Sequence, residues 1–233
     1  MAAGRPRTPA LGLARRSGSS RLSTTAASSP LRRHPWVLRW AGLLMRGRHA
    51  GDASLACSDA ALARLPATIE LRSADFAHGA AMAQRQAGEG VGGNRSPALA
   101  WTELPPQATH WLLLCEDPDV PLPRAITHAL AWGPSSVNAL PEGALNGGHA
   151  PAGVTLAMNG LGRLGYDGPR PLPGHGPHRY VFQLYALDAV PPPDLSREDG
   201  LLPWLHAHAL ARGRLDGLYQ RDWRGRTVVA SPP

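Results

Sequence analysis

The sequence predicts a mostly β protein: a β-sandwich with long glycine- and proline-rich loops and one helix near the C-terminus. Glycine and proline supply 26 and 24 of the 233 residues without a collagen-like period, which favours many turns between short strands. Several short runs are continuously apolar or alternate between apolar and polar residues, as strands do. Only one stretch keeps helical spacing, so the order of elements does not fit a series of βαβ units.

The expected strands follow from these runs, taken in chain order. Residues 68–73 alternate, and residues 96–101 begin with a Ser-Pro step. Residues 110–116 and 126–132 are continuously apolar, which is typical of buried strands. Residues 180–187 combine aromatic and branched side chains that suit a pleated core surface, and they form the clearest strand.

One helix is expected after the three prolines at 191–193. Ser196 and Asp199 have the spacing of an N-terminal capping box, and Gly213 is expected to end the helix. A short strand at residues 227–229 and a proline-ended tail complete the chain. The side chains that would share the apolar face of the helix are Leu202, Leu205 and Ala209.

Residues 1–55 differ from the rest of the chain in charge and composition. All 24 basic residues are arginine, and ten of them lie in residues 1–50, where Asp and Glu are absent. Residues 51–233 therefore carry 14 arginines against 17 acids, a net charge of −3. We expect a disordered Arg/Ser/Ala-rich extension at 1–55, or an upstream region included by too early a start codon, with Met45 as a candidate start. The alternatives are a targeting peptide and a structured role. A domain at 66–220 and a tail at 221–233 follow.

Charge, hydropathy and cysteine usage exclude several classes of protein. The mildly acidic domain has no basic face for nucleic acid. The apolar segment at 36–45 is shorter than the ~20 residues of a spanning helix and contains Arg39, so we expect no integral membrane segment. Cys57 and Cys115 are far apart and indicate no disulfide framework, which fits a cytoplasmic protein.

Two carboxylates follow the apolar run at 110–116. Pro118 separates Asp117 from Asp119, and Pro121 follows two residues after Asp119. Proline is excluded from the interior of a helix and from the middle of a sheet. The segment is therefore expected to be a rigid loop that holds both carboxylates in fixed directions, and loops of this kind often carry functional sites.

Two histidines and a tyrosine are expected near this loop. His128 lies in the next strand, and His178 and Tyr180 lie at the start of the clearest strand. A histidine beside a carboxylate tends to stay protonated, so a protonated pair would favour an anion such as phosphate. Gly168 would add a backbone wall that approaches the anion closely. The alternative is that each histidine only satisfies local hydrogen bonds.

The motifs around these residues resemble a known family. They are Cys-Glu-Asp-Pro-Asp-Val-Pro at 115–121, His128, Gly-Tyr-Asp-Gly-Pro at 165–169, Gly-His-Gly-Pro-His-Arg-Tyr-Val-Phe at 174–182 and Asn-Arg-Ser-Pro-Ala-Leu-Ala-Trp at 94–101. Together, over roughly residues 66–220, they are similar to the signature regions of the phosphatidylethanolamine-binding proteins. The bacterial Raf-kinase-inhibitor-like branch is the most similar.

The resemblance implies a sandwich of two antiparallel sheets with a small pocket for an anion, such as a phospholipid head group. Matched by motif position, the residues that would bind the ligand are Asp117, His128, Gly168, Arg170, His178 and Tyr180. The residues that would support the site are Pro118, Asp119, Pro121 and Arg179, with Asp119 as the candidate partner of Arg179. Ala129 departs from the usual Trp, so the pocket is more open or Trp132 compensates.

Three functions are compatible with these residues. The favoured one is non-enzymatic binding of a small anionic ligand without a cofactor; regulation of a partner protein and a homodimer stay open. The second is a hydrolase in which Asp117 orients His128 or His178 as a base, although a Gly-x-Ser-x-Gly elbow is absent. The third is a metal site whose ligands would be Asp117, Asp119, His128 and His178.

Overall fold

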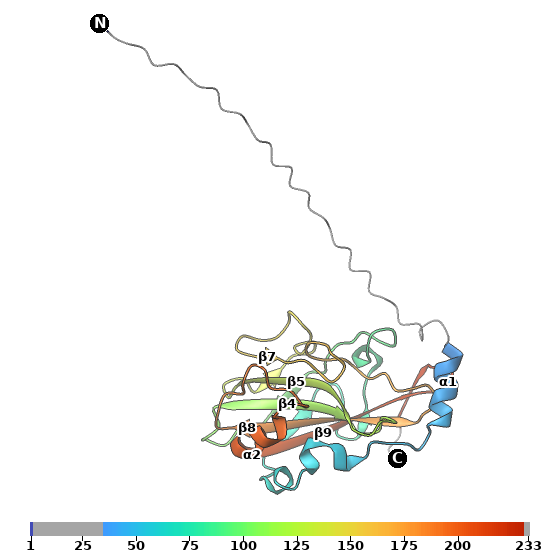
Figure 1. Ribbon diagram of the computed structural model, residues 1–233, viewed down its shortest axis with the longest axis horizontal. Helices are drawn as coiled ribbons and strands as arrows, with labels where there is room; N and C mark the ends of the chain where they lie inside the picture. The colour runs from blue at the N-terminus through green and yellow to red at the C-terminus, as the bar shows by residue number, and fades with distance from the viewer. Residues whose placement is uncertain (2–34, 231–233) are drawn as a thin grey trace.

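Two β-sheets packed face to face form the core of the computed structural model, which describes residue 1 and residues 35–230 (Figure 1). The larger sheet has the strand order β10-β9-β8-β4-β5-β7, and β2 pairs in parallel with β9. The smaller sheet has the antiparallel order β1-β3-β6. The strands are β1 (Leu71–Ser73), β2 (Ala80–Ala81), β3 (Leu99–Trp101), β4 (His110–Asp117), β5 (Ile126–Pro134), β6 (Ala139–Leu140), β7 (Thr155–Leu156), β8 (Pro177–Leu187), β9 (Ala209–Arg221) and β10 (Thr227–Val228).

The structure confirms the predicted mostly β sandwich, and β4 shows why its strands could be recognised. Trp111 and Leu113 contact the core between the two sheets. Leu112 and Leu114 contact a second core on the outer face of the larger sheet. A strand that is buried on both faces has no polar side, so its sequence is a continuous apolar run.

The outer core is covered by a helix and by the chain that precedes β1. Helix α2 (Leu201–His208) contributes Leu201 and Leu205, and the short 3-10 helix Leu62–Arg64 contributes Leu62. Two further 3-10 helices, Asp52–Ser54 and Ala56–Ser58, precede it, and a fourth spans Gln84–Gln86. These segments place residues 52–64 beside the central strands.

Helix α2 is shorter than the sequence predicts. Ser196 Oγ accepts a hydrogen bond from the Asp199 N–H at 3.0 Å, but this turn precedes the helix. Gly200, with φ of 79°, stands at the helix N-terminus instead. The expected tail also contains more structure than predicted, because β9 reaches Arg221 and β10 occupies the strand expected at 227–229.

The prediction that Gly213 ends the helix is wrong, because this residue lies inside β9. A Cβ at Gly213 would come 2.5 Å from the carbonyl oxygen of Ile69, so the close approach of the chain before β1 requires glycine. Ala211 and Leu215 face the core between the sheets. Buried and half-buried residues alternate over residues 211–215, but several of them are alanine, glycine or arginine instead of large apolar residues. The sequence of this part of β9 therefore resembles the end of a helix.

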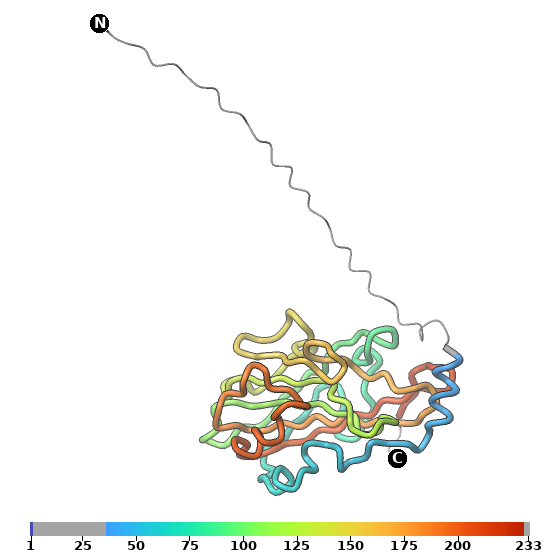
Figure 2. The backbone as a smooth tube through the Cα atoms, viewed as in Figure 1, coloured from blue at the N-terminus to red at the C-terminus, as the bar shows by residue number. Residues whose placement is uncertain are grey.

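Residues 35–55 are structured, so the expectation of a disordered extension at 1–55 is wrong for this part; residues 2–34 lie outside the described residues. Helix α1 (Pro35–Leu44) lies at one end of the sheets (Figure 1). The chain after it runs along the edge of the sandwich toward the 3-10 helices (Figure 2). Within the described part of the chain, no helix combines the length and apolar character needed to cross a membrane.

Candidate functional site

A cavity of about 740 Å³ opens at the end of the larger sheet where β4 finishes and β5 and β8 begin. Five of the six residues predicted to bind a ligand line it. The polar lining consists of Asp117, His128, Arg170, His178 and Tyr180. The apolar lining consists of Met45, Val120, Pro121, Leu122, Ile126, Leu161, Pro171 and Leu172. The cavity therefore has a small polar floor and a mostly apolar wall.

The pairing of three strands brings the polar floor together. β4 lies between β5 and β8 and is antiparallel to both, so its end meets their beginnings: Asp117 pairs with Ile126, the first residue of β5, and Glu116 pairs with Val181 near the start of β8. The register of β4 and β5 shifts so that Cys115 pairs with Ala129 and Glu116 pairs with Thr127. His128 is the extra residue of this β-bulge, and bulges redirect a side chain in this way.

Asp117 and His178 form a buried pair on the cavity floor. Oδ2 of Asp117 lies 2.8 Å from Nδ1 of His178, and the two side chains are each 2% exposed. Oδ1 of Asp117 accepts a hydrogen bond from the N–H of Asp119 at 2.8 Å. This second bond fixes the carboxylate within its own loop, as the alternation of Asp and Pro predicts.

A second histidine extends this pair away from the cavity. Nε2 of His178 lies 2.9 Å from Nδ1 of His175, and Nε2 of His175 lies 3.2 Å from the carbonyl oxygen of Arg48. The histidine pair therefore connects the Asp117 carboxylate to the segment that follows α1. His175 belongs to the motif at 174–182, but nothing in the sequence assigned it a role in the site.

The hydrogens of this row follow from its end at Arg48. A carbonyl oxygen only accepts, so Nε2 of His175 carries the hydrogen of the contact with Arg48. Burial lowers the pKa of His175, and the neighbouring His178 and His49 lower it further. Neutral His175 therefore donates to the Arg48 carbonyl and accepts from Nε2 of His178, while Nδ1 of His178 contacts the Asp117 carboxyl group.

His128 has the opposite character. Its Nδ1 hydrogen bonds to the carbonyl oxygen of Asp167, so Nδ1 carries the hydrogen. Burial lowers the pKa of His128, although Asp117 and Asp167 act in the other direction. A neutral ring with hydrogen on Nδ1 leaves Nε2 as an acceptor, and no hydrogen bond from a described residue reaches Nε2.

These contacts correct the expectation that two protonated histidines donate to an anion. His128 is neutral and offers an acceptor, while both ring nitrogens of His178 are used by Asp117 and His175. Tyr180 keeps its phenol hydrogen, because burial and the charge of Asp117 raise its pKa well above the usual value. The rings of Tyr180 and His128 meet edge to face at 5.0 Å.

Arg170 is the cationic side chain of the cavity wall, and Gly168 lies behind the wall. Arg170 donates to Asp167 at 2.6 Å, and Oδ1 of the fully buried Asp167 has no hydrogen-bond partner among the described residues. Gly168 does not line the cavity: its N–H donates to Asn94 Oδ1 at 2.7 Å. A Cβ there would come 2.0 Å from the carbonyl oxygen of Gln86, so close packing requires the glycine.

Asp119 supports the loop from outside the cavity. Its carboxylate accepts hydrogen bonds from the N–H, Nε and Nη2 of Arg179 at 2.7, 2.9 and 2.8 Å. Burial raises the pKa of Asp119, but the hydrogen bonds from Arg179 outweigh burial and lower it below the usual value. Arg179 also reaches Asp52 at 2.7 Å and so links the loop to the first 3-10 helix.

The structure also places residues for which sequence analysis gave a different role or none. Ala129 is fully buried in the core between the sheets, and Trp132 is buried in the outer core, so neither shapes the cavity wall. Met45 lines the cavity although it belongs to the N-terminal segment. The apolar run at 36–45 was the only feature of the sequence that could have indicated a buried Met45, but nothing in the run relates it to the motifs downstream.

The arrangement of these side chains weakens the two alternative functions. Among residues 35–230, no group of three or more His, Cys, Asp or Glu side chains is placed to hold a metal ion. Asp117 and His178 contact each other directly, and Asp119 is taken by Arg179. No serine, threonine or cysteine belongs to the described lining of the cavity, so a hydrolase of the Ser, Thr or Cys type would lack its nucleophile there.

Comparison with protein families gives one match. The sequence model described as phosphatidylethanolamine-binding protein matches residues 72–220. Among curated proteins, the UPF0098 protein of Methanothermobacter thermautotrophicus is 40% identical over 133 residues, which are 56% of this chain and 85% of that protein. The UPF0098 protein YbhB of Escherichia coli is 34% identical over 125 residues, 52% of this chain and 78% of that protein.

Solved structures give the same result at the level of the fold. Escherichia coli YbcL, described as a new member of the mammalian PEBP family, aligns with a TM-score of 0.59 and 26% identity over 65% of this chain and 98% of that one. A putative phosphatidylethanolamine-binding protein homolog of Chlamydia trachomatis aligns with a TM-score of 0.58 and 28% identity, covering 67% and 99% of the two chains. Helix α1 and Met45 precede the residues that the sequence model matches.

Proposed function

Since this chain belongs to the phosphatidylethanolamine-binding protein family, we propose that it binds a small phosphorylated molecule in the 740 Å³ cavity and does not transform it. The observation that carries the proposal is the division of the cavity into a polar floor and an apolar wall. Asp117, His128, Tyr180 and Arg170 offer hydrogen bonds and charge at one end of the cavity. Few polar groups in a mostly apolar cavity are typical of sites that fix the orientation of a small ligand.

The polar groups favour a ligand that both accepts and donates hydrogen bonds. Arg170 supplies a cation and N–H donors, which suit phosphate oxygens. His128 Nε2 is an acceptor, and a phosphate oxygen without a hydrogen would meet its lone pair unfavourably. A phosphomonoester that keeps one acidic hydrogen satisfies both groups, with its O–H directed to His128.

Binding is favoured over hydrolysis by the contacts of the two histidines. His178 has no ring nitrogen left to act as a base, because Asp117 and His175 occupy both. His128 Nε2 is available, but the described cavity lining offers no serine, threonine or cysteine for it to activate. Regulation of a partner protein, a homodimer and a cytoplasmic location stay predictions from the sequence.

Isothermal titration of the full chain with O-phosphoethanolamine tests the proposal. We expect one site per chain, and a loss of at least tenfold in affinity for Arg170→Gln, because this variant removes the cation of the cavity wall. Arg163→Gln is the matched control: Arg163 lies 3.7 Å from the same Asp167 carboxylate but does not line the cavity. Absence of heat with the unmodified chain, or equal affinities for the two variants, would overturn the proposal.

A further inference from the structure

Helix α1 has apolar side chains on both its inner and its outer faces. Its sequence, PWVLRWAGLL, contains one charged residue and no acid. Gly42 is buried and packs against the carbonyl group of Pro173, which defines the inner face. Trp36, Trp40 and Leu44, spaced four residues apart, form the outer face and are 60, 68 and 83% exposed. A helix that is apolar on all sides is normally buried. The exposed outer face of α1 is therefore suited to contact another apolar surface.

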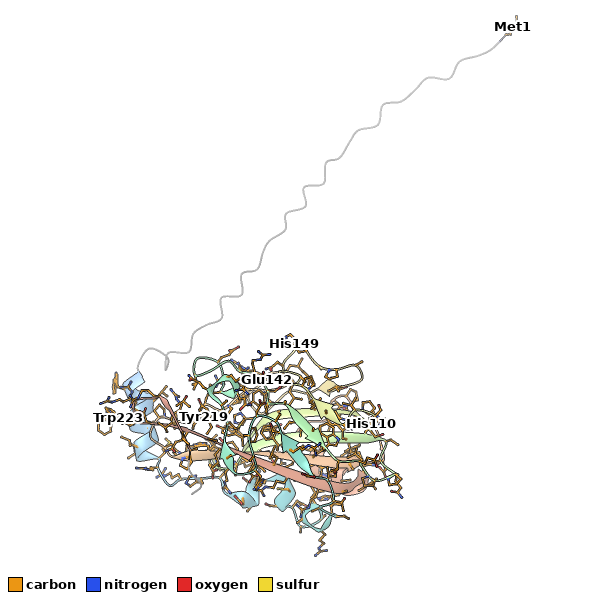
Figure 3. All side chains as sticks on the ribbon, turned by 180° about the vertical axis from the view of Figure 1, so that it is seen from behind. Met1, His110, Glu142, His149, Tyr219 and Trp223 are labelled. Atoms are coloured by element: carbon orange, nitrogen blue, oxygen red, sulfur yellow. The ribbon has the colours of Figure 1, made fainter. Side chains whose placement is uncertain are left out.

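Three arginines lie near this face: Arg39 is half-buried within α1, Arg224 is exposed beside Trp223, and exposed Arg46 follows the helix. Trp223 lies beside α1 at the end of the molecule opposite His110 and is 52% exposed (Figure 3). The guanidinium groups of Arg39 and Arg224 lie 5.7 and 5.6 Å from the centre of the Trp223 ring. The ion pairs formed by described residues leave Arg39, Arg224 and the exposed Arg46 without a carboxylate partner. Tryptophan and leucine flanked by arginine are typical of segments that lie in the interface of a membrane.

We propose that the outer face of α1, together with Trp223, docks onto the surface of an anionic lipid bilayer. The helix has ten residues and lies against the domain, so it would rest in the interface and not cross the bilayer. Trp40 and Leu44 enter the boundary between head groups and acyl chains, and Arg39, Arg46 and Arg224 contact lipid phosphates. Met45 follows the helix and lines the cavity, so docking places the cavity mouth next to the lipid.

Charge favours a lipid surface over a second copy of the chain. In a symmetric dimer each patch meets the same patch on the other copy. Arg39, Arg46 and Arg224 would then approach their counterparts, and like charges at an interface oppose association. An anionic bilayer offers opposite charge and an apolar interior together, which matches both properties of this face.

Co-sedimentation with vesicles tests the proposal on the full chain. We expect the chain to sediment with vesicles of phosphatidylcholine mixed with phosphatidylglycerol, and much less with phosphatidylcholine alone. Trp40→Ser combined with Leu44→Ser should reduce the partition coefficient at least tenfold. Leu164→Ser combined with Val190→Ser is the matched control, since both residues are exposed, at 53 and 65%, and lie outside α1. The control should sediment like the unmodified chain.

A charge variant keeps the test informative if the apolar variant fails to fold. Arg39→Gln, Arg46→Gln and Arg224→Gln together should abolish the preference for phosphatidylglycerol. Sedimentation that does not depend on phosphatidylglycerol, or that the two patch variants leave unchanged, would overturn the proposal. So would analytical ultracentrifugation that finds a dimer which Trp40→Ser with Leu44→Ser converts to a monomer, because the occupant would then be a second copy. Ligand binding in the cavity is measured without vesicles, so its outcome is independent.

Discussion

Nε2 of His178 lies 2.9 Å from Nδ1 of His175, and this contact determines what the cavity floor presents to a ligand. His178 would otherwise have a free ring nitrogen beside Asp117. With His175 in place, His178 is held between a carboxylate and a second imidazole, and both of its ring nitrogens have partners within the protein. A ligand in the cavity would therefore meet Asp117, Tyr180 and neutral His128, with Arg170 at the wall.

Replacing His175 by Phe should destabilise the protein. The variant keeps a ring of similar size but removes the acceptor for His178 and the donor for the Arg48 carbonyl. We expect a loss of about 1–3 kcal/mol in the free energy of unfolding, the usual cost of leaving a buried polar group without a partner. Urea denaturation measures it. His149→Phe, at an exposed position, should change stability little; an equal effect in both variants would contradict the assigned hydrogen bonds.

The cavity should distinguish a phosphate ester from a sulfate ester. Ethanolamine O-sulfate has the shape of O-phosphoethanolamine but carries no acidic hydrogen for His128 Nε2. We expect the phosphate ester to bind at least tenfold more tightly, a difference of about 1.4 kcal/mol. Its affinity should rise as the pH falls toward about 6, where the phosphomonoester takes up its proton. Calorimetry at several pH values tests this, and equal affinities would mean that His128 acts as a donor.

Asp119 should contribute to stability through Arg179. Asp119→Asn keeps the shape but removes the charge that receives the forked hydrogen bonds. Because the Arg179 side chain is 24% exposed, we expect a loss of about 1–3 kcal/mol, less than for a fully buried pair. Urea denaturation near neutral pH measures it. Asp188→Asn, whose carboxylate is 45% exposed beside His208, is the control and should cost under about 1 kcal/mol.

Stability should fall in mild acid partly because of His128. Burial lowers its pKa in the folded state, so the unfolded chain takes up a proton more readily. The stabilisation is present above the ordinary histidine pKa of about 6.5 and is lost as the pH falls through the lower value of the folded state. His128→Asn retains an N–H for the Asp167 carbonyl but does not titrate. Its free energy of unfolding should depend less on pH between about 7 and 5; an unchanged slope would assign the effect to other groups.

Gly42→Ala should separate α1 from the domain. The new Cβ would come 2.1 Å from the carbonyl oxygen of Pro173, which is too close for any real contact. Trypsin cleaves after arginine, so mass spectrometry of the fragments that end at Arg46 or Arg48 reports on the segment after α1. We expect cleavage there to be at least tenfold faster than in the unmodified chain. Gly147→Ala, where a Cβ would meet nothing within 4 Å, should leave the rate unchanged.

The sequence allowed the sandwich and most of the cavity floor to be predicted, because both depend on local patterns. Apolar runs mark β4 and β5, and the Asp-Pro loop follows directly. β9 was not predicted, because its glycines interrupt the strand pattern. Gly213 and Gly217 are required by close contacts with Ile69 and Met82, which are distant in sequence. The protonation of the histidines could not be predicted either, because it depends on which carbonyl oxygens reach each ring.

The position of Met45 bears on how this protein should be compared with its relatives. The residues that match the family begin at Arg72, whereas Met45 lines the cavity and the Arg48 carbonyl contacts His175. A fragment trimmed to the shared region would keep Asp117, His128 and His178 but would have a wider opening and an unanchored His175. Such a fragment, or a relative without this segment, would have a cavity of different shape. Ligand preferences measured on either would not describe the cavity of this protein.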